Sequence, residues 1–146
     1  MNKEKRIWIA LFLVLTLMVI LSGCSGVAKT ALLSISFDPN PVPYDSTDGK
    51  WHYKINISES NGVGVTVSSF RFDSYNQEEE LTVSYYHYYD DFIVGFETDY
   101  VPPFSSIQAN LIHTGSTTKY TIITVDGTDD NNNFVEATGR VDYLPQ

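Results

Sequence analysis

The residues best suited to ligand chemistry are gathered in the segment SYYHYYDDF, residues 84–92. Exposed tyrosine rings can stack on sugar rings, and carboxylates can accept hydrogen bonds from sugar hydroxyls. The candidate ligand-binding residues are Tyr86, Tyr88, Tyr89, Asp90 and Asp91. The alternative is two ordinary strands that meet at a bend carrying the aspartates. Because neighbouring strand residues point to opposite faces, the tyrosines cannot all form one platform.

A second cluster of oxygen ligands lies in DGTDDNNN, residues 126–133. Asp126, Thr128 and Asp130 alternate along this segment and are candidate ligands for a hard cation such as calcium. The calcium-loop pattern is incomplete, because Asn131 replaces the glycine of the tight turn and Ala137 replaces the closing glutamate. The alternative is a plain hairpin loop, in which aspartate, asparagine and glycine are common. Calcium is therefore an open alternative, and otherwise we expect no cofactor.

The sequence shows no catalytic motif. His52, His87 and His113 lack metal-ligand spacing, and there is no nucleophile elbow, phosphate-binding glycine loop or dinucleotide fingerprint. We therefore expect a protein that is not an enzyme, with no catalytic residue. A Ser-His-Asp triad assembled only in space stays open, because triads are defined by geometry.

The single cysteine, Cys24, follows an apolar block from Ile7 to Leu21. Three basic residues precede this block, and as a helix it is about 22 Å long, shorter than the roughly 30 Å of a bilayer core. A basic start, a short apolar helix and small residues at its end are typical of a secretory signal peptide. The alternative is an uncleaved, tilted membrane anchor.

Leu21-Ser22-Gly23-Cys24 resembles the lipobox of bacterial lipoproteins. The resemblance implies a diacylglyceryl group on the sulfur of Cys24, cleavage before it, and acylation of the new amine. It divides the chain into a signal peptide at 1–23, a tether at 24–30 and a domain at 31–146. The expected location is the bacterial cell envelope: the outer membrane if the cell has one, otherwise the outer face of the cytoplasmic membrane.

Charge and length restrict the partners and the size of the fold. The whole chain has a formal net charge of −9, and loss of residues 1–23 removes three basic residues and one acidic residue. The acidic remainder repels nucleic acid, so we expect no nucleic-acid partner. Its length suits one domain, and with Cys24 modified it has no disulfide. Glu78-Glu79-Glu80 indicates a solvated loop or, alternatively, a recognition patch for a basic partner.

Apolar and polar residues alternate along most of the remaining chain, and this period of two predicts strands. The predicted strands are 33–37, 51–58, 63–67, 81–86, 92–97, 107–113, 118–125 and 134–143. Asn61-Gly62 predicts a hairpin turn, and a phase slip predicts a bulge or a corner near Ser68-Ser69. Loops are expected at 76–80 and 99–106, and turns at 115–116 and 126–133. Regularly spaced strands without helices predict an antiparallel sandwich or barrel.

Three stretches, FDPNPVP, WHYKINISESNGVGVTV and YTIITVDGTDDNNNFVEATGRVDY, resemble the first, middle and last strands of bacterial immunoglobulin-like or fibronectin-III-like domains. The resemblance implies an all-β, single antiparallel β-sandwich of the immunoglobulin-like type, preceded by the signal-peptide helix, with Trp51 as a core aromatic. The chain departs from antibody domains because it lacks their cysteine pair.

The sequence therefore predicts a membrane-anchored, non-catalytic lipoprotein that acts as an interaction or structural module of the cell envelope. Its expected partners are membrane lipid, through the anchor, and another envelope protein or a polysaccharide. The alternative is a carbohydrate-binding module at the cell surface that uses residues 84–92, with a cation at 126–133.

Overall fold

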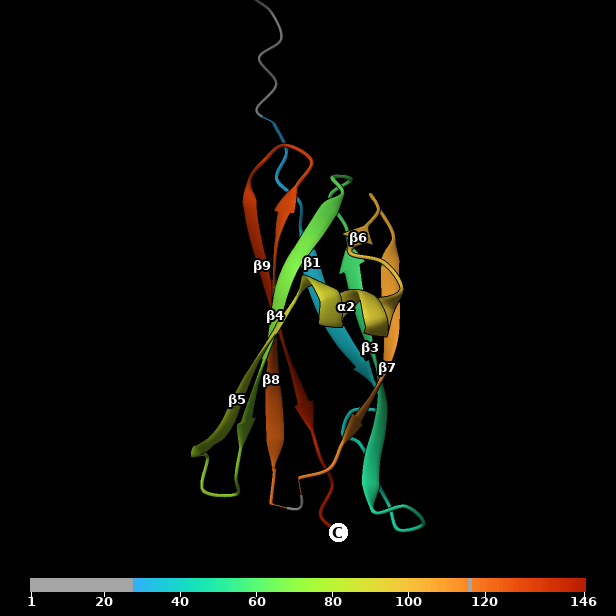
Figure 1. Ribbon diagram of the computed structural model, residues 1–146, viewed down its shortest axis with the longest axis vertical. Coiled ribbons are helices and arrows are strands. Elements are labelled where there is room, and N and C mark those ends of the chain that lie inside the picture. The colour runs from blue at the N-terminus through green and yellow to red at the C-terminus, as the bar shows by residue number, and fades with distance from the viewer. Residues whose placement is uncertain (1–27, 116) are drawn as a thin grey trace, which may run out of the picture.

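The computed structural model describes residues 28–115 and 117–146, except for the side chains of Tyr89 and Asp91. The predicted signal peptide, Cys24 and tether residues 25–27 lie outside the described residues. In the described part, two antiparallel sheets face each other (Figure 1). No helix in this part is both long enough and apolar enough to cross a bilayer.

The first sheet consists of β1 (Leu33–Asp38), β2 (Tyr44–Asp45), β3 (Lys50–Glu59) and β7 (Ser106–His113). The second consists of β4 (Val65–Tyr75), β5 (Leu81–Tyr88), β6 (Tyr100–Val101), β8 (Tyr120–Asp129) and β9 (Phe134–Asp142). A helix, α2 (Tyr89–Phe96), follows β5 directly. In the first sheet β3 pairs with β1 on one side and β7 on the other, and the second has the order β5-β4-β8-β9.

This strand order is that of an immunoglobulin-like sandwich. There, strands A, B and E share one sheet, and strands C, F and G share the other, with C′ added beside C in variable-type domains. Here β1, β3 and β7 take the places of A, B and E, while β5, β4, β8 and β9 take those of C′, C, F and G. The predicted all-β, immunoglobulin-like sandwich is confirmed.

Strand β3 supplies the clearest example of how the sequence builds the core. Its residues alternate strictly, with Trp51, Tyr53, Ile55 and Ile57 buried and the residues between them more exposed. The inward side chains divide into two clusters: the isoleucines join the larger apolar core, whereas Trp51 and Tyr53 pack with Val42, Val141 and Tyr143 near the C-terminus. Trp51 is 2% exposed, so the predicted core aromatic is confirmed.

The predicted strand at 92–97 is wrong, because Tyr89–Phe96 is a helix. The apolar residues of this segment fit both periods, but Phe92 and Phe96 are four residues apart and therefore lie on one helical face. Their rings stack with centroids 4.3 Å apart, and both side chains are buried. Asp90 lies in the first turn, where a carboxylate favours a helix start, and Glu97 ends the helix in the left-handed region.

Asn61-Gly62 forms a turn, with Gly62 at a φ of +81°, but the predicted hairpin is wrong. The strands on either side, β3 and β4, belong to different sheets, so the turn is a corner between the sheets.

Two further predictions, the bulge and the turn at 126–133, can be compared with the structure. The bulge predicted near Ser68-Ser69 is confirmed by a register shift between Val67 and Ser69. The turn predicted over 126–133 is shorter, because β8 continues to Asp129.

Candidate functional site

The two long sides of the sandwich differ. On one side β1 packs directly on β9: a Cβ at Gly139 would lie 2.8 Å from the Cβ of Ile35, so only glycine permits this approach. On the other side lie β5 and β7, the terminal strands of their sheets. Helix α2 contacts both strands together with β4 (Figure 1). It fills the gap between the sheets there with Phe92 and Phe96.

Beyond α2, toward the C-terminus, the gap between the sheets stays open and forms a cavity of about 330 Å³, which we call the groove. Its β4–β5 wall contains Phe72, Val83, Tyr85 and His87, and its β7 wall contains Leu111, Ile112 and His113. Its floor contains Tyr53, Ser74, Thr121 and Tyr143. Apolar walls with a few convergent polar groups are typical of a binding site for a small ligand or side chain.

The floor of the groove is a network of hydroxyl groups. Ser74 Oγ lies 3.0 Å from Thr121 Oγ1, and the Tyr143 hydroxyl lies 3.2 Å from Thr121 Oγ1 and 3.3 Å from the Tyr53 hydroxyl. Burial raises the pKa of both tyrosines, so both remain protonated near neutral pH. These hydroxyls can donate and accept hydrogen bonds but are not ionised nucleophiles.

Two histidines, His87 and His113, line the walls of the groove. His113 stacks on Tyr143 with ring centroids 4.4 Å apart, and its Nε2 lies 3.3 Å from the carbonyl oxygen of Gly115. Burial lowers the pKa of His113, which favours the neutral ring. His87 stacks on Phe70 with centroids 5.0 Å apart. Both rings therefore pack as part of the aromatic wall.

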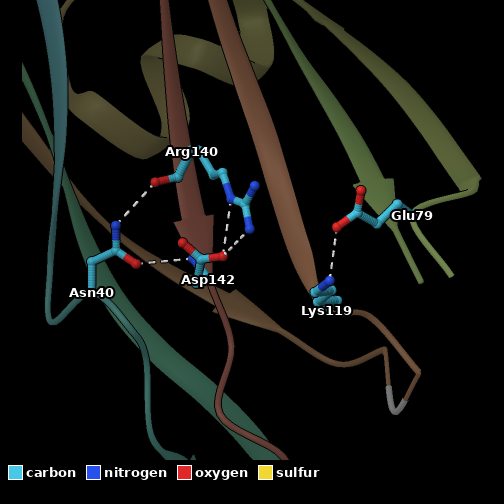
Figure 2. A network of polar contacts seen from close by, with 5 residues as sticks. All are labelled: Asn40, Glu79, Lys119, Arg140 and Asp142. Carbon is cyan, nitrogen blue, oxygen red and sulfur yellow. Dashed lines mark hydrogen bonds and ion pairs between the residues drawn. The ribbon is translucent and has the colours of Figure 1, made fainter. Parts of the chain in front are cut away.

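Polar contacts hold the C-terminal end of the sandwich in shape (Figure 2). Lys119 Nζ lies 2.9 Å from Glu79 Oε1, which ties the β4–β5 turn to the start of β8. Asn40 binds β9 twice, since its amide donates to the Arg140 carbonyl at 3.0 Å and accepts from the Asp142 N–H at 2.9 Å. The contact between Lys119 and Glu79 fixes the β4–β5 hairpin, which forms one wall of the groove.

The structure separates the predicted ligand-binding residues. Tyr86 and Tyr88 are 57% and 70% exposed, and they lie on the face of β5 that points away from the groove. Arg71 Nη1 donates to the Tyr86 hydroxyl at 2.8 Å. Tyr89, Asp90 and Asp91 belong to the first turn of α2, where Asp90 is exposed. The side chains of Tyr89 and Asp91 lie outside the described residues.

The predicted cation ligands have separate protein partners. Asp126 Oδ2 accepts from Ser69 Oγ at 3.2 Å, whereas Asp130 Oδ2 accepts from the Gly64 N–H at 3.1 Å and the Tyr100 hydroxyl at 3.0 Å. Thr128 is exposed on β8 between them. Asp126 lies within β8, whereas Asp130 lies in the turn just after its last residue, Asp129, so the two carboxylates project from different points along the chain. Cation binding at these residues stays a prediction.

Two buried carboxylates escaped the sequence analysis. Glu59 accepts hydrogen bonds from the backbone N–H groups of Leu32, Asn61, Gly62 and Phe104, at 2.7–3.2 Å. Burial alone raises the pKa of Glu59, but these donors outweigh it and bring the pKa to about 2. The sequence did contain a signal for the burial of Glu59, because this residue continues the alternating inward-facing set of β3 that begins at Trp51.

Asp129 is the second buried carboxylate, and it lies in the acidic segment between the residues singled out as cation ligands. Its oxygens accept from the backbone N–H groups of Ala31, Asn131 and Asn133 at 2.8–3.0 Å. Burial raises the pKa of Asp129, while the Asn133 side chain and these N–H groups lower it, and the net direction is downward. Asp129 and Glu59 together fix residues 31 and 32, where the chain enters the sandwich.

One further cluster has metal-type donors. Single ligand atoms of Asp45, Asp48 and His52 lie within 4.8 Å of one another, and His52 Nε2 is 2.8 Å from Asp48 Oδ2. All three side chains are exposed. A hydrogen bond between two exposed side chains accounts for the contact between His52 and Asp48.

No protein-family model matches the sequence, and no curated protein matches it. Among solved structures, a Bordetella pertussis crystal structure assigned to an ApaA protein has a TM-score of 0.55 at 16% identity, covering 81% of this chain and 98% of that chain. The structural genomics target SoR45 has a TM-score of 0.49 at 12% identity, covering 81% and 90%. The CARDB domain of PF1109 from Pyrococcus furiosus, in complex with di-metal ions, has a TM-score of 0.38 at 15% identity, covering 80% and 94%. At these identities the likeness concerns the fold alone.

Proposed function

We propose that this chain is a lipid-anchored, non-catalytic binding module of the bacterial cell envelope, with the groove as its binding site. The observation that carries the proposal is the groove itself, an open cavity of about 330 Å³ between two terminal strands of the sandwich. A binding role agrees with the chemistry of the lining, since its hydroxyls stay protonated and its histidines pack in aromatic stacks.

The position of the groove fits a tethered module. Residues 28–31 enter the sandwich at the end that holds Glu59 and Asp129, whereas the groove opens at the end where the C-terminus lies (Figure 1). A domain attached through Cys24 would therefore carry its binding site on the side away from the bilayer. The proposed partner is another component of the envelope.

The anchor is tested by exchanging Cys24 for alanine. Cys24→Ala removes the thioether and should release the protein from membranes without unfolding it, because residue 24 precedes the predicted domain at 31–146. The measurement is the distribution between membrane and soluble fractions, with intact-mass spectrometry of the wild type to detect the lipid. A variant that still sediments with membranes would contradict the anchor.

The binding site is tested by site-specific photocrosslinking in cells of the native bacterium. A photoreactive phenylalanine at Tyr85, which lines the groove and is 61% exposed, should form adducts with an envelope component. The matched control is the same group at Phe134, which is 70% exposed on β9 near the opposite end. Equal adducts from both positions, or none from Tyr85, would remove the groove as the site.

A carbohydrate-binding module is the second candidate, and the pair Tyr86 and Tyr88 favours it. Both rings are exposed on the same face, about 7 Å apart along the strand, a spacing that suits stacking on sugar rings. Titration with cell-wall and polysaccharide fragments, followed by tyrosine fluorescence, tests it. Tyr86→Ala and Tyr88→Ala should abolish the signal, whereas Tyr85→Ala on the groove side should retain it. No change in tyrosine fluorescence across the panel, with and without calcium, would eliminate this candidate.

A further inference from the structure

We infer that the outer edge of β5 is a docking site for an extended polypeptide segment of another protein, apolar in its middle and basic at both ends. The segment adds to the second sheet as an extra strand and places alternate side chains in the groove. This inference rests on the proposed function, because it names the class of partner that the groove receives.

The first observation is the open edge. Strand β5 pairs with β4 from Leu81 opposite Tyr75 to Tyr88 opposite Ser69, and within the described residues no strand pairs with its other side. The single register irregularity between these strands lies at Ser74 and Tyr75, near the start of β5. The rest of β5 therefore presents a regular row of backbone N–H and C=O groups. Such a row is a template for strand addition.

The second observation is the composition of β5. Its sequence, LTVSYYHY, has no charged residue, no proline and no glycine, although natural sheets commonly protect their edges with lysine or proline. Leu81, Val83 and Tyr85 are 54%, 36% and 61% exposed. A β-prone, uncharged and exposed edge strand pairs readily with another extended chain.

The third observation is the groove beside this edge. Val83, Tyr85 and His87 alternate along β5 and all line the groove, whose opposite wall is formed by Leu111 and His113 of β7. Side chains of an added strand also alternate between its two faces. Every second residue of that strand would therefore enter the groove, so the backbone pairing supplies affinity and the groove selects the side chains.

The charges at the two ends of β5 select the partner. Glu78, Glu79 and Glu80 precede the strand, and Asp90 and Asp91 follow it. Glu79 pairs with Lys119, whereas Glu78 and Glu80 take part in no ion pair within the described part of the chain. In a pair of two copies through β5, acidic ends would meet acidic ends in either strand direction, which is repulsive. A foreign strand with basic ends is attracted instead.

The test uses the full-length chain in detergent and two synthetic peptides. Each peptide has six alternating valine and threonine residues, one with two lysines at each end and the other with two glutamates. Calorimetry should show binding of the lysine peptide and an affinity for the glutamate peptide about tenfold lower at low salt, a gap that narrows at high salt. Amide hydrogen exchange should slow in β5 and stay unchanged in β9.

Charge reversal tests the selection directly. Glu78→Lys combined with Glu80→Lys should remove most of the preference for the lysine peptide, because one end of β5 becomes basic while Asp90 and Asp91 keep the other end acidic. The matched control is Asp38→Lys combined with Glu136→Lys, which changes the net charge equally through exposed residues of β1 and β9 and should leave the preference unchanged. An unchanged preference in the first variant, or peptide binding without protection of β5, would overturn the inference.

Two outcomes separate this inference from the proposed function. If Tyr85 crosslinks to an envelope component but the lysine peptide does not bind, strand addition is wrong and the groove remains a binding site. If neither occurs, both fail. The other possible occupant of this edge is a second copy of the chain, and sedimentation equilibrium tests it. A dimer that the lysine peptide dissociates would assign the edge to the second copy and overturn the inference.

Discussion

Glu59 shows how one buried carboxylate can organise three separate segments. Its two oxygens accept N–H groups from the entry of β1, from the corner between β3 and β4, and from the loop before β7. A buried backbone donor without an acceptor costs about 1–3 kcal/mol, so the carboxylate replaces several such costs at once. It is 3% exposed, and water has little access to replace it.

Glu59→Gln should therefore lower the free energy of unfolding by about 3 kcal/mol at pH 7, because the amide turns an NH₂ group toward two N–H donors. The pKa of Glu59 is depressed from 4.5 to about 2 in the folded protein. Its charge thus stabilises the fold above pH 4.5, and this contribution is lost as the pH falls from 4.5 toward 2. Urea unfolding of both proteins at several pH values should show their difference shrinking over that interval.

Glu136→Gln is the matched control, because Glu136 is exposed on β9. It should change the free energy of unfolding by less than about 0.5 kcal/mol. A difference between wild type and Glu59→Gln that stays constant down to pH 3 would mean that the ionised carboxylate is not what holds the corner.

At the scale of elements, period-two alternation predicts most of the sandwich, and β3 is the clearest case. The same signal fails at 92–97, because the run Phe-Ile-Val-Gly-Phe satisfies both the strand and the helix period and only tertiary packing decides between them. The Asn61-Gly62 signal specifies a turn but not whether the next strand stays in the same sheet. The groove could not be foreseen, since it depends on where α2 ends.

Helix α2 fills the gap between the two sheets at one side of the sandwich, and Phe92 is its main contact with the core. Its side chain is fully buried and meets Phe70 and Phe96, with ring centroids 5.5 Å and 4.3 Å away. Phe92→Ala should lower the free energy of unfolding by about 3–5 kcal/mol, because it removes a large buried ring and leaves a cavity. Thermal and urea unfolding measure the loss.

Val94→Ala, on the same helix but at an 85% exposed position, is the matched control and should have little effect. If Phe92→Ala and Val94→Ala were equally mild, α2 would not close the gap between the sheets, and the boundary assigned to the groove would be wrong.

A substitution at Gly95 should raise the free energy of unfolding rather than lower it. Gly95 lies within α2, and a Cβ at this position would meet no atom within 4 Å. Gly95→Ala should therefore raise the free energy of unfolding by about 0.5–1 kcal/mol, since alanine restricts the unfolded chain and favours the helix. A rise in the thermal midpoint checks this. A fall would show that this turn is not helical in solution.

At the scale of the whole molecule, residues 28–30, which end the predicted tether, and the groove lie at opposite ends of the sandwich. Asn131 and Asn61 donate to the carbonyl oxygens of Lys29 and Thr30, which holds the end of the tether against the sandwich. Five residues, 24–28, then remain between this attachment and the proposed lipid, and at full extension they reach about 17 Å. Strand β3 alone is about 33 Å long, so the tether is short relative to the domain.

This geometry predicts a preferred orientation on the membrane. In nanodiscs that contain a paramagnetic lipid, the amide signals of Asn61 and Asn131 should weaken strongly in the lipidated protein, whereas those of Gly49 and Thr117 at the far end should keep most of their intensity. The net negative charge of the domain also works against its lying flat on an anionic bilayer. Cys24→Ala, added at the same concentration, should show no attenuation at either end. Stronger attenuation at Gly49 and Thr117 than at Asn61 would place the groove against the lipid, where a strand from an envelope protein could not reach β5.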